Sequence, residues 1–317
     1  MARFPFGKQT TLRRATALSG IGVHSGRTIS VVLHPADANS GICFHRTASN
    51  EKRQYVIPAD YRHVNATELC TSLGVGNVSV ATVEHLMAAL SALAVDNVIV
   101  EIDGSEVPVM DGSAGPFVEA IDQVGVVVLA APRRYIKVLK PVRVEIGEGY
   151  GEFRPFDGSR FEIEIDFANA AIGRQVYAAD IDAERFRNEI ARARTFGFLA
   201  DVENLWARGF ALGASLDNAV VIAEDRIVNP EGLRFADEFV RHKALDAIGD
   251  IALAGAPILG CYSSFKGGHR LNVESVRALL ADEAAYEFVE LAPIRSTVGH
   301  ADLPAGVSVA AYGPDVS

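Results

Sequence analysis

HKALDAIGDIAL, residues 242–253, and EHLMAALSALA, residues 84–94, are the two stretches that decide the fold. Each has a histidine at or next to its start and continues with the alanine- and leucine-rich pattern of a helix. Each then leads into a strand-like run, PILGCYS at 257–263 and DNVIVEI at 96–102. The repetition fits two copies of one α+β unit, although a single pairing of this kind also arises by chance. Strands and helices segregate along the chain, which disfavours a doubly wound parallel sheet.

The boundary between the two units is expected at Ala-Pro-Arg-Arg, residues 131–134, where the apolar pattern of the first half stops. We therefore predict a first α+β domain over residues 1–130 and a second over residues 134–300. Within the second, FEIEIDF at 161–167 alternates apolar and acidic side chains, which is typical of a strand with one solvated face. This strand is expected to belong to an antiparallel sheet.

The remaining elements are predicted from hydrophobic period and from the residues at element ends. Thr82 is expected to cap the helix that carries His85. Further helices are expected at 115–124, 183–192 and 239–253, and a further strand at 28–34.

Composition and charge exclude several classes of protein. Of 317 residues, 49% are hydrophobic and 22% are charged, as in ordinary globular proteins. A formal charge of −10 disfavours binding to the phosphates of nucleic acid. The longest apolar run, residues 124–131, is too short to span a membrane, and the N-terminus lacks the apolar core of a secretion signal. We therefore expect a cytoplasmic protein with no transmembrane segment and no nucleic-acid partner. The sequence does not determine the oligomeric state, and we expect a monomer.

The most specific chemical signal is the HxxxD pattern of His242 and Asp246. Four residues on a helix turn the chain by only about 40° beyond a full turn, so both side chains lie on one face and can share a metal ion. In isolation such a pair is more often a salt bridge on a polar face. Here Asp250 extends the stripe, and both helices have small residues where their histidines point, namely Gly249 on one and Ala88, Ala89 and Ala92 on the other. Small side chains would let the helices approach as a shared ion requires, although ordinary alanine-rich packing is the alternative. With His85 as third ligand, one tetrahedral position stays open for water, which is typical of catalytic zinc.

Three more side chains are candidates for chemistry. Glu84 and His85 project about 100° apart on their helix, so one can bind a metal while the other acts as a base. His269 is predicted on the glycine-containing loop FKGGH with Lys266, a cation that can meet a phosphate. A lone histidine on a loop is more often an exposed side chain without a role. His24 is expected on a tight turn.

Six segments together resemble one protein family. They are GIGVHSG (20–26), TVEHLMAAL (82–90), VPVMDGSAGPFV (107–118), ARARTFGF (191–198), GLRFADEFVRHKALDAIGD (232–250) and FKGGH (265–269). This pattern is similar to the UDP-3-O-acyl-N-acetylglucosamine deacetylases of lipid A biosynthesis in Gram-negative bacteria. The resemblance implies a zinc-dependent amidohydrolase that removes acetate from UDP-3-O-(3-hydroxyacyl)-N-acetylglucosamine, in the committed step of that pathway. It also implies two similar domains, each a β-sheet with helices, the helices sandwiched between the two sheets.

The resemblance further assigns roles at the matching positions. The implied ligands of Zn²⁺ are His85, His242 and Asp246, and these ligand types also accept Fe²⁺. The implied catalytic groups are the base Glu84, the acid His269, the oxyanion donor Thr195, and Asp250 as the partner of His269. The implied substrate contacts are Lys243, Lys266, His24, Asp166 and Phe167, with residues 198–216 as an acyl passage.

Other interpretations remain open at this stage. A nucleotide-sugar or lipid-binding protein on the same scaffold would not need a base and an acid beside intact ligands. An unrelated zinc peptidase would not account for the acyl-passage segment. Trp206 in that segment is expected in the core rather than in a channel. Glu68 departs from the family pattern near the rim of the site, and residues 301–317 receive no role.

Overall fold

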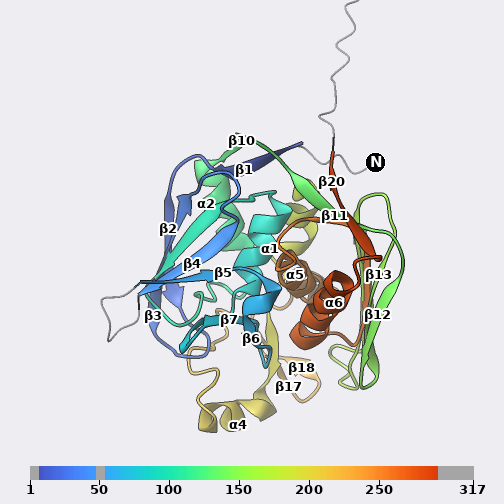
Figure 1. Cartoon of the computed structure of the whole chain (residues 1–317). Helices are drawn as coiled ribbons and strands as arrows, with labels where there is room; N and C mark the ends of the chain where they lie inside the picture. The colour runs from blue at the N-terminus through green and yellow to red at the C-terminus, as the bar shows by residue number, and fades with distance from the viewer. Residues whose placement is uncertain (1–6, 48–53, 292–317) are drawn as a thin grey trace, which may run out of the picture.

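The computed structural model describes residues 7–47 and 54–291 and has a mixed α+β architecture (Figure 1). Figure 1 shows helices α1 (Glu84–Ala92), α5 (Glu238–Ala252) and α6 (His269–Ala281) between a five-stranded sheet on the left and a seven-stranded sheet on the right. The α+β class expected from the sequence is confirmed. No helix among the described residues is long and apolar enough to cross a bilayer.

In each large sheet, an interior strand directly follows one of the central helices: β9 (Val98–Ile102) follows α1, and β19 (Ile258–Phe265) follows α5. The five-stranded sheet has the order β2-β3-β9-β4-β5, with bounds Thr16–Ile21, Thr28–Pro35, Val98–Ile102, Ile42–Thr47 and Gln54–Pro58. The seven-stranded sheet has the order β12-β13-β19-β11-β20, with bounds Val142–Ile146, Gly149–Arg154, Ile258–Phe265, Arg134–Val138 and Tyr286–Glu290. Its other two strands are β14 (Ser159–Asp166), which pairs with β19, and β15 (Arg174–Asp180), which pairs with β14.

Smaller elements complete the described chain. The short strands are β1 (Lys8–Leu12), β6 (Val64–Ala66), β7 (Ser72–Val75), β8 (Val78–Val80), β10 (Val126–Pro132), β16 (Phe196–Phe198), β17 (Val220–Ala223) and β18 (Arg226–Ile227). The other helices are α2 (Gly115–Val124), α3 (Ala183–Arg185) and α4 (Val202–Ala207). The predicted helix at 115–124 is therefore confirmed.

The acidic-apolar strand at 161–167 is confirmed, but the prediction of an antiparallel sheet is wrong. In β14, Phe161, Ile163 and Ile165 are buried while the alternating glutamates face outward. This strand runs antiparallel to β15 but parallel to β19. The parallel pairing arises because the chain leaves β14, passes through α5 and returns beside it, and such a crossover joins parallel neighbours. β4 and β9 form the equivalent parallel pair in the other sheet.

Two local predictions differ from the structure. Thr82 does not cap α1: the N-cap position is Val83, no side chain caps the helix, and Thr82 has a positive φ of 55°. The helix predicted at 183–192 is α3 followed by a π-helical turn at Phe186–Ile190. This wider turn places both Phe186 and Ile190 in the core, which regular helical spacing does not anticipate.

The closest approach of α1 and α5 occurs at Gly249. A Cβ atom on this glycine would lie 2.0 Å from the carbonyl oxygen of Glu84. Because no side chain fits there, the backbones of the two helices touch. The contact lies at the first turn of α1 and beside Asp250, so it sets how the functional side chains of both helices face each other.

We expect Gly249→Ala to reduce the free energy of unfolding by about 1–3 kcal/mol, because the helices must separate to admit a methyl group. Chemical denaturation measures this change. Gly197→Ala is the matched control, since a Cβ there meets nothing within 4 Å; its effect should stay within about 0.5 kcal/mol. Wild-type stability in Gly249→Ala would show that the helices tolerate a wider separation.

Candidate metal centre and catalytic site

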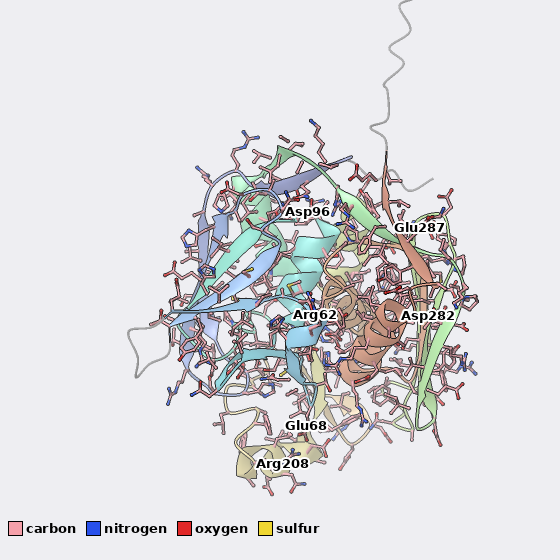
Figure 2. All side chains as sticks on the ribbon, in the orientation of Figure 1. Arg62, Glu68, Asp96, Arg208, Asp282 and Glu287 are labelled. Carbon is pink, nitrogen blue, oxygen red and sulfur yellow. The ribbon has the colours of Figure 1, made fainter. Side chains whose placement is uncertain are left out.

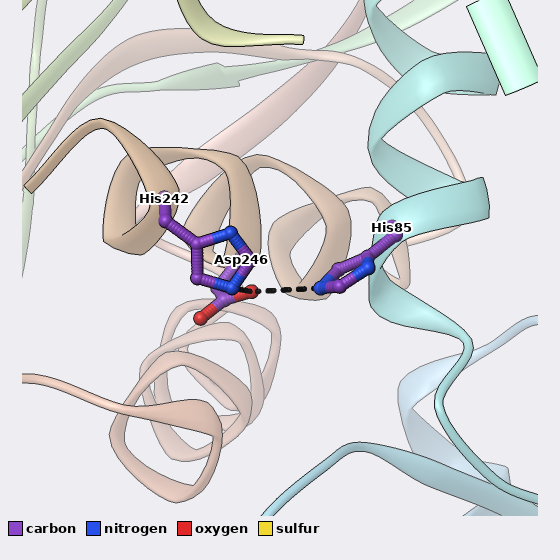
Figure 3. Close-up of side chains that lie close together, drawn as sticks. All are labelled: His85, His242 and Asp246. Carbon is purple, nitrogen blue, oxygen red and sulfur yellow. Dashed lines mark ion pairs between the residues drawn. The ribbon is translucent and has the colours of Figure 1, made fainter. Parts of the chain in front are cut away.

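Three buried side chains from two helices converge on one point (Figure 3). His85 lies in the first turn of α1, and His242 and Asp246 lie one turn apart on α5. The Nε2 atoms of His85 and His242 lie 3.6 and 3.4 Å from Oδ1 of Asp246. One candidate ligand atom from each residue lies within 4.8 Å of the other two. The HxxxD pair thus shares one helix face and meets a histidine from the other helix.

The hydrogen bonds of these three residues leave atoms available for a metal ion. Nδ1 of His242 contacts the carbonyl oxygen of Ala193 at 3.0 Å, so it is the protonated nitrogen and Nε2 keeps its lone pair. Lys243 donates to Oδ2 of Asp246 at 2.8 Å. Oδ1 of Asp246 is buried without a hydrogen bond. Two imidazole nitrogens and one carboxylate oxygen suit Zn²⁺, so the residues present fit this ion.

The protonation states of the ligands suit a divalent cation. Burial lowers the pKa of His242 to about 4, although Asp246 opposes this shift, so the ring is neutral at pH 7. Burial would raise the pKa of Asp246, but His242 and Lys243 hold it well below its usual range. A neutral imidazole and an ionised carboxylate are the forms that bind metals.

Glu84 and His269 face each other beside the metal group. Oε1 of Glu84 lies 3.9 Å from Nε2 of His269, and Nδ1 of His269 lies 2.9 Å from Oδ2 of Asp250. Burial alone would lower the pKa of His269, but the carboxylates of Asp250 and Glu84 raise it to about 9. Burial raises the pKa of Glu84, and His269 opposes this shift. The ring is therefore cationic at pH 7, with Nε2 turned toward Glu84.

The sequence predicted His269 on a loop, but this residue is the first of helix α6. The preceding glycines allow the chain to turn tightly here, since a Cβ on Gly267 would lie 2.0 Å from the hydroxyl of Ser264. The loop therefore ends at Gly268, and the helix fixes the backbone of the histidine.

The structure places Lys243 and Lys266 in ion pairs. Lys243 is bound to the ligand Asp246. Lys266 has a positive φ of 48°, and its ammonium lies 2.9 Å from Glu148 and 3.5 Å from Asp166 at the end of β14. Asp166 and Lys266 therefore lie together at the carboxyl ends of the parallel strands β14 and β19.

His24 lies against an aromatic side chain of the segment at 198–216, and Phe167 lies against one just before it. The ring of His24 meets Phe210 edge-on at 5.4 Å, and its Nε2 is buried without a hydrogen bond. Burial lowers the pKa of His24, with Glu106 opposing, which favours the neutral ring. Phe167 contacts Phe196 at 5.8 Å, and Phe196 in turn lies 6.3 Å from the ring of His242.

Thr195 is linked to the metal group only through the chain segment that contacts His242. It follows Ala193, whose carbonyl holds His242, by two residues. Its backbone is fixed by hydrogen bonds to Gly112 and Val220, and the residue is half-buried. Among the described residues, no hydrogen bond joins its side chain to the metal group.

The segment at 198–216 carries exposed apolar side chains, so the expectation that Trp206 lies in the core is wrong. Trp206 is 53% exposed, and Leu212 equally so. Leu199 and Leu216 of the same segment are also exposed, so its apolar side chains are not part of the protein core. Figure 2 shows Arg208 of this segment close to Glu68 at the lower edge of the molecule, and the two form an ion pair.

Two residues of the site escaped the sequence analysis. Thr71 and Asn272 both donate hydrogen bonds to Asp250. Neither belongs to a ligand-spaced motif, and a threonine before a strand carries no signal of such a role. Their contacts with Asp250 can be identified only from the structure or from similarity over the whole chain.

A cavity of about 700 Å³ lies elsewhere, between the C-terminal parts of α1 and α5 and the strands beside them. Its lining includes Met87, Ser91, Ile248 and Ile251, but none of the three metal ligands. The cavity is therefore separate from the metal group.

Comparison with known proteins identifies relatives over most of the chain. The family model LpxC, UDP-3-O-acyl N-acetylglycosamine deacetylase, matches residues 9–281. UDP-3-O-acyl-N-acetylglucosamine deacetylases from Brucella ovis and Brucella suis are each 59% identical over 283 residues, and that from Brucella melitensis is 58% identical. Each alignment covers 89% of this chain and 98% of the relative. The chain therefore belongs to the UDP-3-O-acyl-N-acetylglucosamine deacetylase family.

Proposed function

We propose that this chain is a zinc-dependent deacetylase of lipid A biosynthesis. Its substrate is UDP-3-O-(3-hydroxyacyl)-N-acetylglucosamine, and its products are acetate and the free amine. The observation that carries this proposal is the buried group of His85, His242 and Asp246 with two proton-handling side chains beside it. The relatives named above are deacetylases of the same substrate class. Action in the cytoplasm remains a prediction from the sequence.

The metal chemistry follows from the ligand set. His85, His242 and Asp246 would hold Zn²⁺, or Fe²⁺ as the alternative ion for these donors. When bound, zinc lowers the pKa of a water molecule and polarises the amide carbonyl. Lys243 keeps Asp246 oriented, and Ala193 keeps His242 in the tautomer that a metal needs.

Glu84 is the proposed general base. Its Oε2 accepts a hydrogen bond from the backbone of Thr71 at 3.0 Å, which leaves Oε1 to take a proton from the attacking water. Glu84 directly precedes the ligand His85 on α1, and its Oε1 lies 3.9 Å from Nε2 of His269. The charge of the tetrahedral transition state then needs a hydrogen-bond donor, for which we propose Thr195.

His269 is the proposed general acid. The cationic ring holds a proton on Nε2, and Asp250 holds Nδ1, so the proton available for the leaving amine is the one that faces the site. Proton transfer from Nε2 to nitrogen completes the cleavage of the C–N bond. A binding protein would have no use for this acid and base beside a metal group.

We propose substrate contacts at the rim of the site. Lys243, Lys266 and His24 would contact the sugar and diphosphate, and Asp166 and Phe167 would lie near the uridine. Residues 198–216 would hold the acyl chain, with about 0.8 kcal/mol of transfer free energy for each buried methylene. Exposed apolar side chains on this segment, including Trp206 and Leu212, support this assignment.

We also propose that the two α+β units, residues 1–130 and 134–300, are related domains. In both, a helix with metal ligands leads into a strand that pairs parallel with an earlier strand of its sheet, α1 into β9 and α5 into β19. Residues 292–300 of the second unit lie outside the described residues.

Metal removal tests the ligand set. We expect a chelator to abolish acetate release from the UDP-acyl-sugar and added zinc to restore it. Asp246→Ala should lose most of the bound zinc, measured by elemental analysis, because it removes an oxygen donor. Asp122→Ala is the control, since this carboxylate lies in an exposed ion pair with Arg187. Stoichiometric zinc in Asp246→Ala would mean that another residue is the third ligand.

His269→Gln tests the general acid. We expect kcat to fall by about 10²–10⁴, the range for loss of an acid catalyst, while zinc content stays unchanged. His34→Gln removes a histidine that pairs with Glu101 on the surface and should retain activity. Full turnover in His269→Gln would exclude this residue from proton transfer.

The pH dependence provides a further test. The pKa of His269 is raised to about 9, above its unfolded value near 6.5, so its ion pairs stabilise the fold fully below about pH 6.5. This stabilisation, and the acid form needed for turnover, should be lost as pH rises through about 9. Asp250→Asn removes the partner charge and should shift the alkaline limb of kcat/KM to lower pH. An unchanged limb would assign it to another group.

A further inference from the structure

We infer that Thr71 is a positioning residue that ties the proposed base to the partner of the proposed acid. This inference rests on the proposed function. The backbone N–H of Thr71 donates to Oε2 of Glu84 at 3.0 Å, and its hydroxyl donates to Oδ1 of Asp250 at 2.6 Å. One buried residue therefore contacts both carboxylates that handle or direct protons.

The backbone of Thr71 is itself fixed to the start of α1. Its carbonyl oxygen accepts a hydrogen bond from the N–H of Val83, the N-cap of that helix, at 3.3 Å. Thr71 is fully buried and directly precedes β7, where sheet pairing holds the next residue. The backbone of Thr71 thus bonds to the backbone of Val83 and to the side chain of Glu84, so the position of its hydroxyl is fixed relative to the base.

Asp250 depends on that hydroxyl. Its Oδ2 accepts bonds from Nδ1 of His269 and Nδ2 of Asn272, both at 2.9 Å, and Asn272 is held in turn by Tyr262. Among the described donors, Thr71 is the one that bonds Oδ1. Asp250 is fully buried, so no solvent replaces a lost donor, and an unsatisfied carboxylate oxygen would favour rotation of the group.

These contacts close a ring of four residues. Glu84 bonds to Thr71, Thr71 to Asp250, and Asp250 to His269, whose Nε2 returns to within 3.9 Å of Glu84. A rotation of Asp250 would therefore turn the ring of His269 and move its Nε2 proton relative to the base. Preorganisation of this kind affects kcat more than substrate binding.

Thr71→Val tests the inference because it removes the hydroxyl but keeps the side-chain shape and the backbone bond to Glu84. We expect kcat to fall by about 10- to 100-fold, the effect of losing a hydrogen bond to a charged group, with little change in KM or zinc content. Thr71→Ser keeps the hydroxyl and should stay within about threefold of wild type. Thr71→Ala deletes the same hydroxyl without the branched side chain and serves if the valine variant does not fold.

A spectroscopic measurement separates positioning from general damage. The Nδ1 proton of His269, assigned by its loss in His269→Gln, should keep its downfield ¹H resonance in Thr71→Ser and lose or shift it in Thr71→Val. Thr11→Val removes a buried threonine hydroxyl on β1 that bonds to the carbonyl oxygen of Asn97, outside the ring of four residues, so it should lower stability without changing kcat or this resonance.

Two results would overturn the inference: wild-type kcat and resonance in Thr71→Val, or equal impairment of the serine and valine variants. A different result would overturn the proposed function but support the contact made by Thr71. In that result the variants show the expected resonance changes, while the wild-type protein with bound zinc releases no acetate from the UDP-acyl-sugar.

Discussion

The close approach of α1 to α5 is the constraint on which the site depends. Gly249 allows the two backbones to touch at the carbonyl of Glu84. Since His85 follows Glu84 and Asp246 lies one turn before Asp250, this single contact sets the separation of metal ligands that are about 160 residues apart in sequence. A larger side chain at this position would push the two helices apart, and the ligands that they carry with them.

The same approach brings charges into the core, where they must satisfy one another. An unpaired buried carboxylate costs several kcal/mol, so each must have partners. Asp246 is paired with Lys243, and Asp250 is paired with His269 and two neutral donors. The exception is Oδ1 of Asp246, which is buried without a hydrogen bond. This oxygen, which has no hydrogen-bond donor, is also the one that lies nearest to Nε2 of both histidines. A bound cation would satisfy it together with the two nitrogens.

The sequence predicted those parts of the site that follow from local periodicity. A spacing of four on one helix puts His242 and Asp246 on one face in any context, so this pair could be found without similarity. The addition of His85 depended on packing between helices, which the small residues suggested and the family likeness assigned. Thr71 could not be found, because a residue before a strand reaches Asp250 only through the tertiary fold. Trp206 was misjudged because apolar character does not distinguish a buried residue from an exposed one.

The metal group and the proposed acyl-binding segment lie in parts of the molecule that differ in burial and in hydrogen bonding. The metal group and the ring around Asp250 are buried between helices, where each rotation breaks several bonds. The segment at 198–216 has exposed side chains, and its ion pair between Arg208 and Glu68 is more than half exposed, so solvent weakens it. If this segment holds the acyl chain as proposed, changes on it would alter acyl-chain binding at little cost to the fold. Changes at the helix contact would instead move Glu84 relative to Asp250 and His269, and so would affect the proposed proton transfers whatever acyl chain is bound.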